Sequence, residues 1–222
     1  MPECYNKGDS TYIYTSFCPN KMNIFQMTHS NSEIGKAKWL EVGYRQFAEH
    51  GPDLLSINKI SHEIGTSRAS FYHYFGDIGN FIDDLLSMHW QIVERFNIIG
   101  KDTCHNLFPD LYDLIAEYPV SHQFSMQLFH ARSNPEFNFL FIKMYEAIAK
   151  AFALKLFARE YQLNQNENDV YKLWLTVGET WYSRLSPQDL SSSTLQKHAR
   201  EIMKSVSNFM NSQLYSSLRE TP

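Results

Sequence analysis

The placement of glycine and proline constrains the fold of this chain more than any other feature. Only 9 Gly and 8 Pro occur in 222 residues. Between residues 51 and 79 these residues interrupt the chain repeatedly, whereas after residue 80 the breaks lie far apart. Since Gly and Pro end helices, this spacing predicts short helices followed by long ones. No alternating pattern typical of strands competes with the helical periodicity, so we expect an all-α fold.

Three helices are predicted before residue 80. In residues 32–50 apolar side chains recur at intervals of three and four, and Gly51-Pro52 marks the end of that helix. Ser56 is placed to cap a second helix that stops at Gly65, and Thr66-Ser67 can cap a third that runs from Arg68 to Phe75. Two short helices joined by a glycine turn and braced by a first helix are the plan of a helix-turn-helix.

The third predicted helix has a polar beginning and an aromatic end. Small and basic side chains can reach base edges, while apolar positions hold such a helix on its support. Arg68 and Ser70 are therefore predicted to read bases, with Ser56, Lys59 and Tyr72 donating to phosphates. The complete set of predicted DNA contacts is Lys36, Ser56, Lys59, Thr66, Ser67, Arg68, Ser70, Tyr72 and His73. The alternative for each of them is an ordinary solvated surface residue.

Three short motifs lie between residues 47 and 75, and their spacing matches a known pattern without insertions. They read Phe47-Ala48-Glu49-His50-Gly51, then Ser56-Ile57-Asn58-Lys59-Ile60-Ser61, then Gly65-Thr66-Ser67 up to Tyr72-His73-Tyr74-Phe75. Over about fifty residues the sequence resembles the TetR (tetracycline-repressor) family of bacterial transcriptional regulators. The resemblance implies a homodimer that binds a double-stranded DNA operator with two recognition helices about one DNA turn apart. It also implies a repressor that is released when a small molecule binds a larger C-terminal helical domain.

One position departs from the family's pattern. Ile78 stands where the family usually has a Lys that helps to hold phosphate. From Glu33 to Gly79 there are five Lys and Arg against six Asp and Glu. This balance predicts weak, salt-sensitive non-specific affinity for DNA. The alternative function is therefore a helical interaction protein that kept the fold but has weak or no operator binding.

The domain organisation follows from the breaks. Residues 1–31 are polar and aperiodic and are predicted to be a poorly ordered tail, 32–79 the helix-turn-helix domain, and 80–222 the ligand-sensing and dimerisation domain. Helices are expected near 80–99, 110–118, 121–133, 135–161, 167–185 and 192–216. By resemblance the last two helices form the dimer interface. Two apolar stripes suit it: Val170, Trp174, Val177 and Trp181, with Gly178 beside them, and Leu195, Ala199, Ile202, Val206, Phe209 and Met210. The alternative for each stripe is packing against the chain's own core.

Aromatic residues are unusually abundant, with 13 Tyr and 16 Phe. They can form a packed core or the walls of a cavity between helices, because small-molecule sites are mostly apolar. An apolar or aromatic ligand is the corresponding expectation. Candidate ligand-binding residues are Met88, Phe124, Gln127, Phe141, Tyr145, Trp174 and Trp181. Core packing is the alternative for most of them.

Enzyme and metal motifs are not found. His62-Glu63 begins like HExxH, but Thr66 stands in place of the second His, and GxSxG, P-loop and GxGxxG patterns are absent. His122 and His130 are predicted to be surface histidines, and the three scattered Cys suggest no zinc site. We therefore expect a protein that is not an enzyme and has no cofactor or metal. The sequence has no signal-peptide pattern and no apolar run long enough to span a membrane, which predicts a cytoplasmic location.

Overall fold

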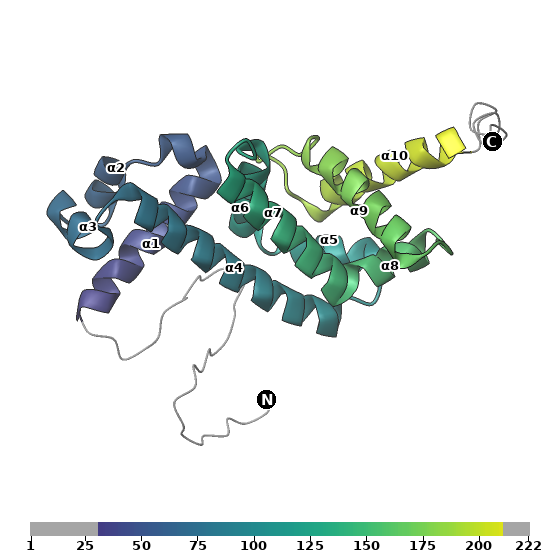
Figure 1. The fold of residues 1–222 in the computed structure, drawn as a ribbon, viewed down its shortest axis with the longest axis horizontal. Helices are drawn as coiled ribbons and strands as arrows, with labels where there is room; N and C mark the ends of the chain where they lie inside the picture. Colours follow the sequence, from purple (N-terminus) through teal and green to yellow (C-terminus); the bar gives the residue numbers. More distant parts are fainter. Residues whose placement is uncertain (1–30, 211–222) are drawn as a thin grey trace, which may run out of the picture.

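The computed structural model describes residues 31–210, and within that range every regular element is a helix (Figure 1). The long helices pack side by side, and the three N-terminal helices gather at one end of the molecule (Figure 1). The α-helices are α1 (Asn31–His50), α2 (Ile57–Glu63), α3 (Arg68–Phe75), α4 (Ile78–Thr103), α5 (Tyr112–Ala116), α6 (Pro119–His130), α7 (Pro135–Ile148), α8 (Leu154–Glu160), α9 (Glu167–Tyr182) and α10 (Ser192–Met210). Three short segments join them: η1 (Pro52–Leu54), η2 (Leu107–Leu111) and η3 (Ala149–Ala153). The predicted all-α fold is confirmed. Residues 1–30 of the predicted tail lie outside the described residues, and Asn31 is the first residue of α1.

The three N-terminal helices have the bounds that the sequence predicts. Gly51, Gly65 and Gly76 have φ angles of 79°, 66° and 75°, the left-handed region that favours glycine, and each follows the end of a helix. Ser56 caps α2, since its hydroxyl accepts a hydrogen bond from the Lys59 backbone N–H. Ser67 occupies the cap position of α3 but accepts no such bond. These turns fix the angle at which α3 leaves the small bundle.

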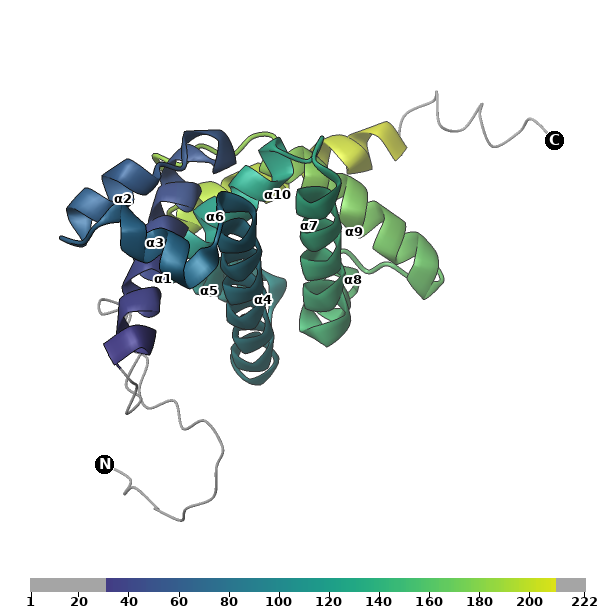
Figure 2. The same ribbon diagram turned by 60° about the vertical axis from the view of Figure 1, so that its left-hand side comes forward.

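Helix α4 connects the N-terminal helices to the rest of the molecule and lies beside α7 (Figure 2). It is longer than the predicted 80–99 at both ends. The Asp77 carboxylate caps its start by accepting from the Asn80 N–H, at 2.9 Å. Gly100 does not end the helix. The ring of Phe152 packs against it, and a Cβ there would lie 2.2 Å from Phe152 Cζ.

Prolines begin two of the later helices instead of separating them. Pro119 and Pro135 are the first residues of α6 and α7, where a missing N–H costs nothing. Helix α6 therefore starts two residues before the predicted 121. Helix α5 covers only part of the predicted 110–118, because the irregular segment η2 precedes it. No helix in residues 31–210 is long and apolar enough to cross a membrane.

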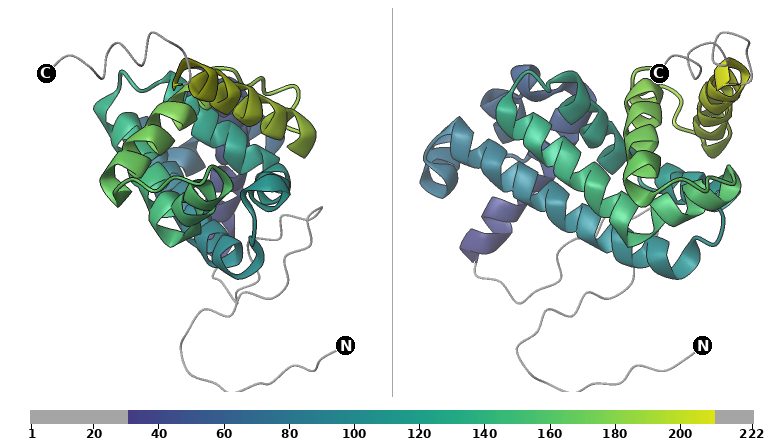
Figure 3. Two further views of the ribbon diagram at one scale, coloured as in Figure 1. Left: turned by 90° about the vertical axis from the view of Figure 1, so that its right-hand side faces the viewer. Right: turned by 45° about the vertical axis from the view of Figure 1, so that its right-hand side comes forward.

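The two stripes assigned to a dimer interface lie mostly inside the chain's own core, so that assignment was wrong for most of their residues. All four stripe residues of α9 are buried, and so are Leu195, Ala199 and Ile202 of α10. A Cβ at Gly178 would lie 1.7 Å from the Tyr145 hydroxyl oxygen, so Tyr145 occupies the space that a partner helix was expected to use. A periodic stripe predicts burial but does not identify the partner. Val206 is half-buried and Phe209 is exposed, on the end of α10 that projects from the body (Figure 3).

Candidate DNA-binding surface and ligand cavity

Helix α3 presents a polar face to solvent and an aromatic face to the core. Arg68, Tyr72 and His73 are exposed, whereas Phe71 and Phe75 are buried. Phe71 packs edge-on against Trp39 of α1, with ring centroids 5.2 Å apart. The aromatic end of the helix thus anchors it, and the residues at its beginning point outward, as a recognition helix requires.

The predicted DNA contacts on α2 and α3 lie close together, with local hydrogen bonds between them. Arg68 Nη1 donates to Asn58 Oδ1 at 3.3 Å, and the hydroxyls of Thr66 and Ser70 are 3.1 Å apart. Ser70 Oγ also donates to the Ser67 carbonyl at 2.7 Å. Asn58 was not among the predicted contacts, although its exposed position in the first turn of α2 could have suggested it.

The predicted DNA contacts on α1 and at the start of α2 differ in their exposure and in whether they already have a partner. Lys36 Nζ lies 2.6 Å from Asp84 Oδ2 of α4 and 5.3 Å from the centre of the Phe75 ring. Contact between Lys36 and DNA would require this ion pair to open. Lys59 is exposed, and Ser56 is half-buried where it caps α2.

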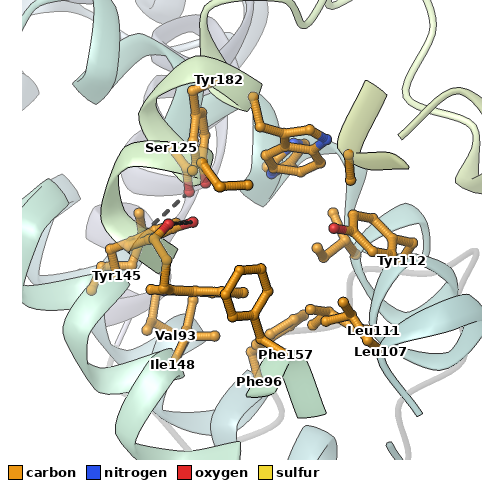
Figure 4. A pocket seen from close by; sticks show the side chains of 18 of the residues that line it. Val93, Phe96, Leu107, Leu111, Tyr112, Ser125, Tyr145, Ile148, Phe157 and Tyr182 are labelled. Carbon is orange, nitrogen blue, oxygen red and sulfur yellow. Dashed lines mark hydrogen bonds between the residues drawn. The ribbon is translucent and has the colours of Figure 1, made fainter. Parts of the chain in front are cut away.

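A cavity of about 90 Å³ lies among the C-terminal helices (Figure 4). It is several times larger than the roughly 10–15 Å³ that one water molecule needs. Helices α4, α6, α7 and α9, which carry the candidate ligand-binding residues, contribute to it, and so do α5, α8 and α10. Its lining residues are Val93, Phe96, Leu107, Leu111, Tyr112, Ile115, Tyr118, Ser121, His122, Ser125, Met144, Tyr145, Ile148, Phe157, Tyr161, Trp174, Val177, Gly178, Trp181, Tyr182, Ala199 and Met203.

The structure separates the predicted ligand-binding residues into three groups. Tyr145, Trp174 and Trp181 line the cavity. Phe141 packs against Tyr145 and Tyr182 beside the wall, and Met88 is buried in α4. Phe124 and Gln127 lie instead where α6 meets α1, as described below.

His122 and Ser125, two of the polar residues that line the cavity, were missed by the sequence reasoning. His122 was predicted to be a surface residue, but it is buried against Trp181 and Tyr182, so that prediction was wrong. His122, Ser125 and Phe129 recur at intervals of three and four on α6 and are all buried. That spacing is the signal that could have identified His122 as facing inward.

The cavity carries no formal charge near neutral pH. Among the described residues that line it there is no Asp, Glu, Lys or Arg. Burial lowers the pKa of His122 from its ordinary 6.5 to about 4, so its imidazole is neutral. Burial also raises the pKa of Tyr112, Tyr145 and Tyr182, so these phenols stay protonated. Within residues 31–210 no group of three His, Cys, Asp or Glu is placed to hold a metal ion.

One side of the cavity is linked to α1 by a buried hydrogen-bonded chain. Ser125 Oγ lies 3.2 Å from His89 Nε2, and His89 Nδ1 lies 2.7 Å from the Tyr44 hydroxyl. Burial lowers the pKa of His89 to about 3, so it too is neutral. All three groups are satisfied if Nε2–H donates to Ser125, Tyr44 donates to Nδ1, and Ser125 donates to the Ser121 carbonyl at 3.1 Å.

Two of the residues that were expected in the cavity, Phe124 and Gln127, lie instead where α6 packs against α1. The ring of Phe124 stacks on Phe47 and Tyr44 of α1, with centroids 4.1 and 4.5 Å apart. Gln127 Nε2 donates to the Ala48 carbonyl at 3.2 Å, near the end of α1. Helix α6 therefore touches both the cavity and the first helix of the helix-turn-helix.

Comparisons with known proteins agree with this architecture. Residues 40–83 match the sequence pattern of bacterial regulatory proteins of the tetR family. The chain is 24% identical over 140 residues to an HTH-type transcriptional regulator of Staphylococcus aureus, covering 61% of this chain and 70% of that protein.

Two solved structures share the fold at low sequence identity. One is a transcriptional regulator from Saccharomonospora viridis in complex with choline, with a TM-score of 0.60, 15% identity, and coverage of 78% of this chain and 96% of that one. The other is a transcriptional regulator from Aquifex aeolicus, with a TM-score of 0.50, 15% identity, and coverage of 78% and 99%. At this identity the likeness concerns the fold.

Proposed function

The chain belongs to the TetR family of bacterial transcriptional regulators, and from that premise we propose that it is a homodimeric repressor that leaves its operator when a small molecule enters the cavity. The family consists of DNA-binding regulators and not of enzymes. The observation that carries the proposal is the pairing of an exposed recognition helix with a cavity whose wall is hydrogen-bonded to α1.

Helix α3 is proposed to enter the major groove. Arg68 and Ser70 read base edges, while Thr66, Ser67 and His73 contribute polar contacts around them. Ser56, Lys59 and Tyr72 donate to phosphates on either side. The exposure of Arg68, Lys59 and Tyr72 supports these roles. Lys36 contributes only in a state in which its ion pair with Asp84 has opened.

Dimerisation is proposed because one short helix contacts too few bases for a specific site. Two copies would place their α3 helices in successive major grooves, about one DNA turn apart. Since the inner stripes of α9 and α10 are occupied, the contact would use their outer faces and the projecting end of α10, where Val206 and Phe209 lie.

The ligand is proposed to act on DNA binding through α6 as well as α4. Ser125 lines the cavity and contacts His89 of α4, which contacts Tyr44 of α1. A ligand that moves Ser125 changes the position of α1 relative to α6. A ligand can shift this equilibrium only as far as its affinities for the two arrangements differ.

The S. viridis regulator binds choline, which makes choline a compound to test on this chain. Aromatic side chains suit a quaternary ammonium group through cation–π contacts. In this chain, however, no carboxylate is among the described residues that line the cavity. Choline is therefore best used as a probe of the site.

The DNA-binding roles can be tested by fluorescence anisotropy with DNA from the region upstream of the protein's own gene. Arg68→Ala is expected to cost about 1–3 kcal/mol of specific binding and to relax sequence preference. Lys59→Ala is expected to weaken all sequences alike and to reduce the salt slope by about 1. Lys101→Ala, an exposed lysine near the far end of α4, is the matched control. Unchanged operator affinity in Arg68→Ala would contradict the placement of α3 in the major groove. If the wild type showed no specific DNA binding, the alternative of a helical interaction protein would be favoured.

A further inference from the structure

Two buried polar atoms, in residues that line the cavity, have no hydrogen-bond partner among the described residues. They are Trp174 Nε1 and His122 Nε2, and both residues are 7% exposed. The neighbouring Trp181 is different, because its Nε1 donates to the Leu195 carbonyl at 2.9 Å. An unpaired polar atom in a buried wall is costly unless something in the cavity satisfies it.

The two atoms differ in their roles as hydrogen-bond donor or acceptor. The indole N–H of Trp174 can only donate, so it requires an acceptor. His122 is neutral near pH 7, because burial holds its pKa at about 4, and its Nε2 either accepts or donates according to its tautomer. A ligand that satisfies both atoms carries an acceptor for Trp174 and a second polar group for His122.

The surroundings of these atoms disfavour a charged ligand. No Asp, Glu, Lys or Arg is among the described lining residues, so an ion would lose its hydration without gaining a counter-charge. Cation–π contacts could offset part of this cost. One face of the Trp174 ring, however, is stacked on Tyr145, with centroids 5.2 Å apart and an interplanar angle of 26°. A tetraalkylammonium group would also leave the indole N–H unpaired.

We propose that the cavity binds an uncharged, largely apolar molecule that bears a hydrogen-bond acceptor, with Trp174 Nε1 as the donor that selects it and His122 Nε2 as a second polar contact. This inference rests on the proposed function, since it specifies the ligand class of the same cavity. Carbonyl, ether and phenol oxygens are acceptors of the required kind.

Four phenyl compounds of similar size test the ligand class on the full-length protein by isothermal titration calorimetry. They are acetophenone (neutral, with an acceptor), isopropylbenzene (neutral, without one), phenyltrimethylammonium (cation) and benzoate (anion). Acetophenone is expected to bind about threefold to tenfold more tightly than isopropylbenzene, as one net hydrogen bond allows. Both ions are expected to bind more weakly than acetophenone.

The role of Trp174 is tested by Trp174→Phe, which keeps an aromatic ring and removes the N–H. The advantage of acetophenone over isopropylbenzene should disappear in this variant. It should persist in Trp90→Phe, the matched control, because Trp90 is not among the residues that line the cavity. His122→Phe, which keeps a ring and removes both nitrogens, is expected to weaken acetophenone less than Trp174→Phe does.

Three outcomes would overturn the proposal. Tightest binding of phenyltrimethylammonium would make this an organic-cation site. A preference for acetophenone that survives Trp174→Phe would place the donor elsewhere, and no binding of acetophenone at about 1 mM would exclude the ligand class. If Trp174→Phe does not fold, the ranking of the four compounds on the wild type decides the question. The ranking is measured without DNA, so a probe that binds as expected but does not release the operator contradicts the proposed function alone.

Discussion

Ile78 lies in the first turn of α4, next to the end of the recognition helix, and is 40% exposed. A helix start favours phosphate because its N–H groups and dipole attract anions, and a lysine there would add a charge contact. Ile78→Lys is therefore expected to strengthen DNA binding at every sequence. The slope of log affinity against log salt should steepen by about 1.

The control for Ile78→Lys is Ile98→Lys, which makes the same charge change at a 65% exposed position farther along α4. Anisotropy titrations at three salt concentrations separate the two variants. An equal gain in both would mean that net charge matters and that the start of α4 does not contact DNA.

The Tyr44–His89 hydrogen bond joins α1 directly to α4, and Phe124 of α6 stacks on Tyr44 and His89 beside it. Tyr44→Phe leaves buried His89 Nδ1 without its donor, so it is expected to lower the free energy of unfolding by about 1–3 kcal/mol. In a His89→Leu background the same change should cost much less, because the partner is already absent. Denaturant unfolding of the four proteins in this cycle measures the coupling.

Exposed Tyr72 supplies the control, since Tyr72→Phe removes a hydroxyl from the surface of α3 and should leave stability unchanged. An equal loss for Tyr44→Phe in both backgrounds would mean that its hydroxyl acts through another group. The result bears on function, because Ser125 on the far side of His89 lines the cavity.

The whole molecule should lose stability in mild acid because of its two buried histidines. Burial lowers the pKa of His89 to about 3 and of His122 to about 4, whereas both are near 6.5 in the unfolded chain. Below pH 6.5 the unfolded state therefore binds more protons than the folded state, and the free energy of unfolding falls as pH falls. Each histidine contributes up to about 1.4 kcal/mol per pH unit.

Urea unfolding at pH 7, 6 and 5 measures this slope. His122→Asn is expected to unfold with a shallower dependence on pH than the wild type. The exposed His62→Asn should keep the wild-type slope. Identical slopes in all three proteins would show that other groups cause the acid sensitivity.

Assembly of two copies is the remaining prediction for the whole molecule. Phe209 is 53% exposed on the projecting end of α10, and a charge there would be duplicated across a two-fold axis. Phe209→Glu is expected to yield monomers in sedimentation experiments at micromolar concentration, whereas Ser205→Glu, also exposed on α10, is the comparison for an added charge. A monomeric wild type would contradict the proposed dimer and the use of two adjacent grooves.

The sequence by itself determined the N-terminal helices and the exposed face of α3. Gly51, Gly65 and Gly76 end those helices, and the alternation of Phe71 and Phe75 with Tyr72 and His73 sets which side is buried. These features are local, since a glycine turn or a capping hydroxyl acts within a few residues of its own position. The start of α6 differed from the prediction for an equally local reason, the tolerance of proline in a first turn.

Only the tertiary structure decided which buried residues face the cavity and which face another helix. Phe124 and Trp174 are both apolar residues on helical stripes, yet one stacks on α1 and the other lines the cavity. The stripe of α9 meets Tyr145 of its own chain, and His122 is buried although a histidine is usually exposed. Periodicity predicts which side of a helix is buried. It does not predict which helix or cavity that side faces, because this depends on how segments distant in the sequence pack together.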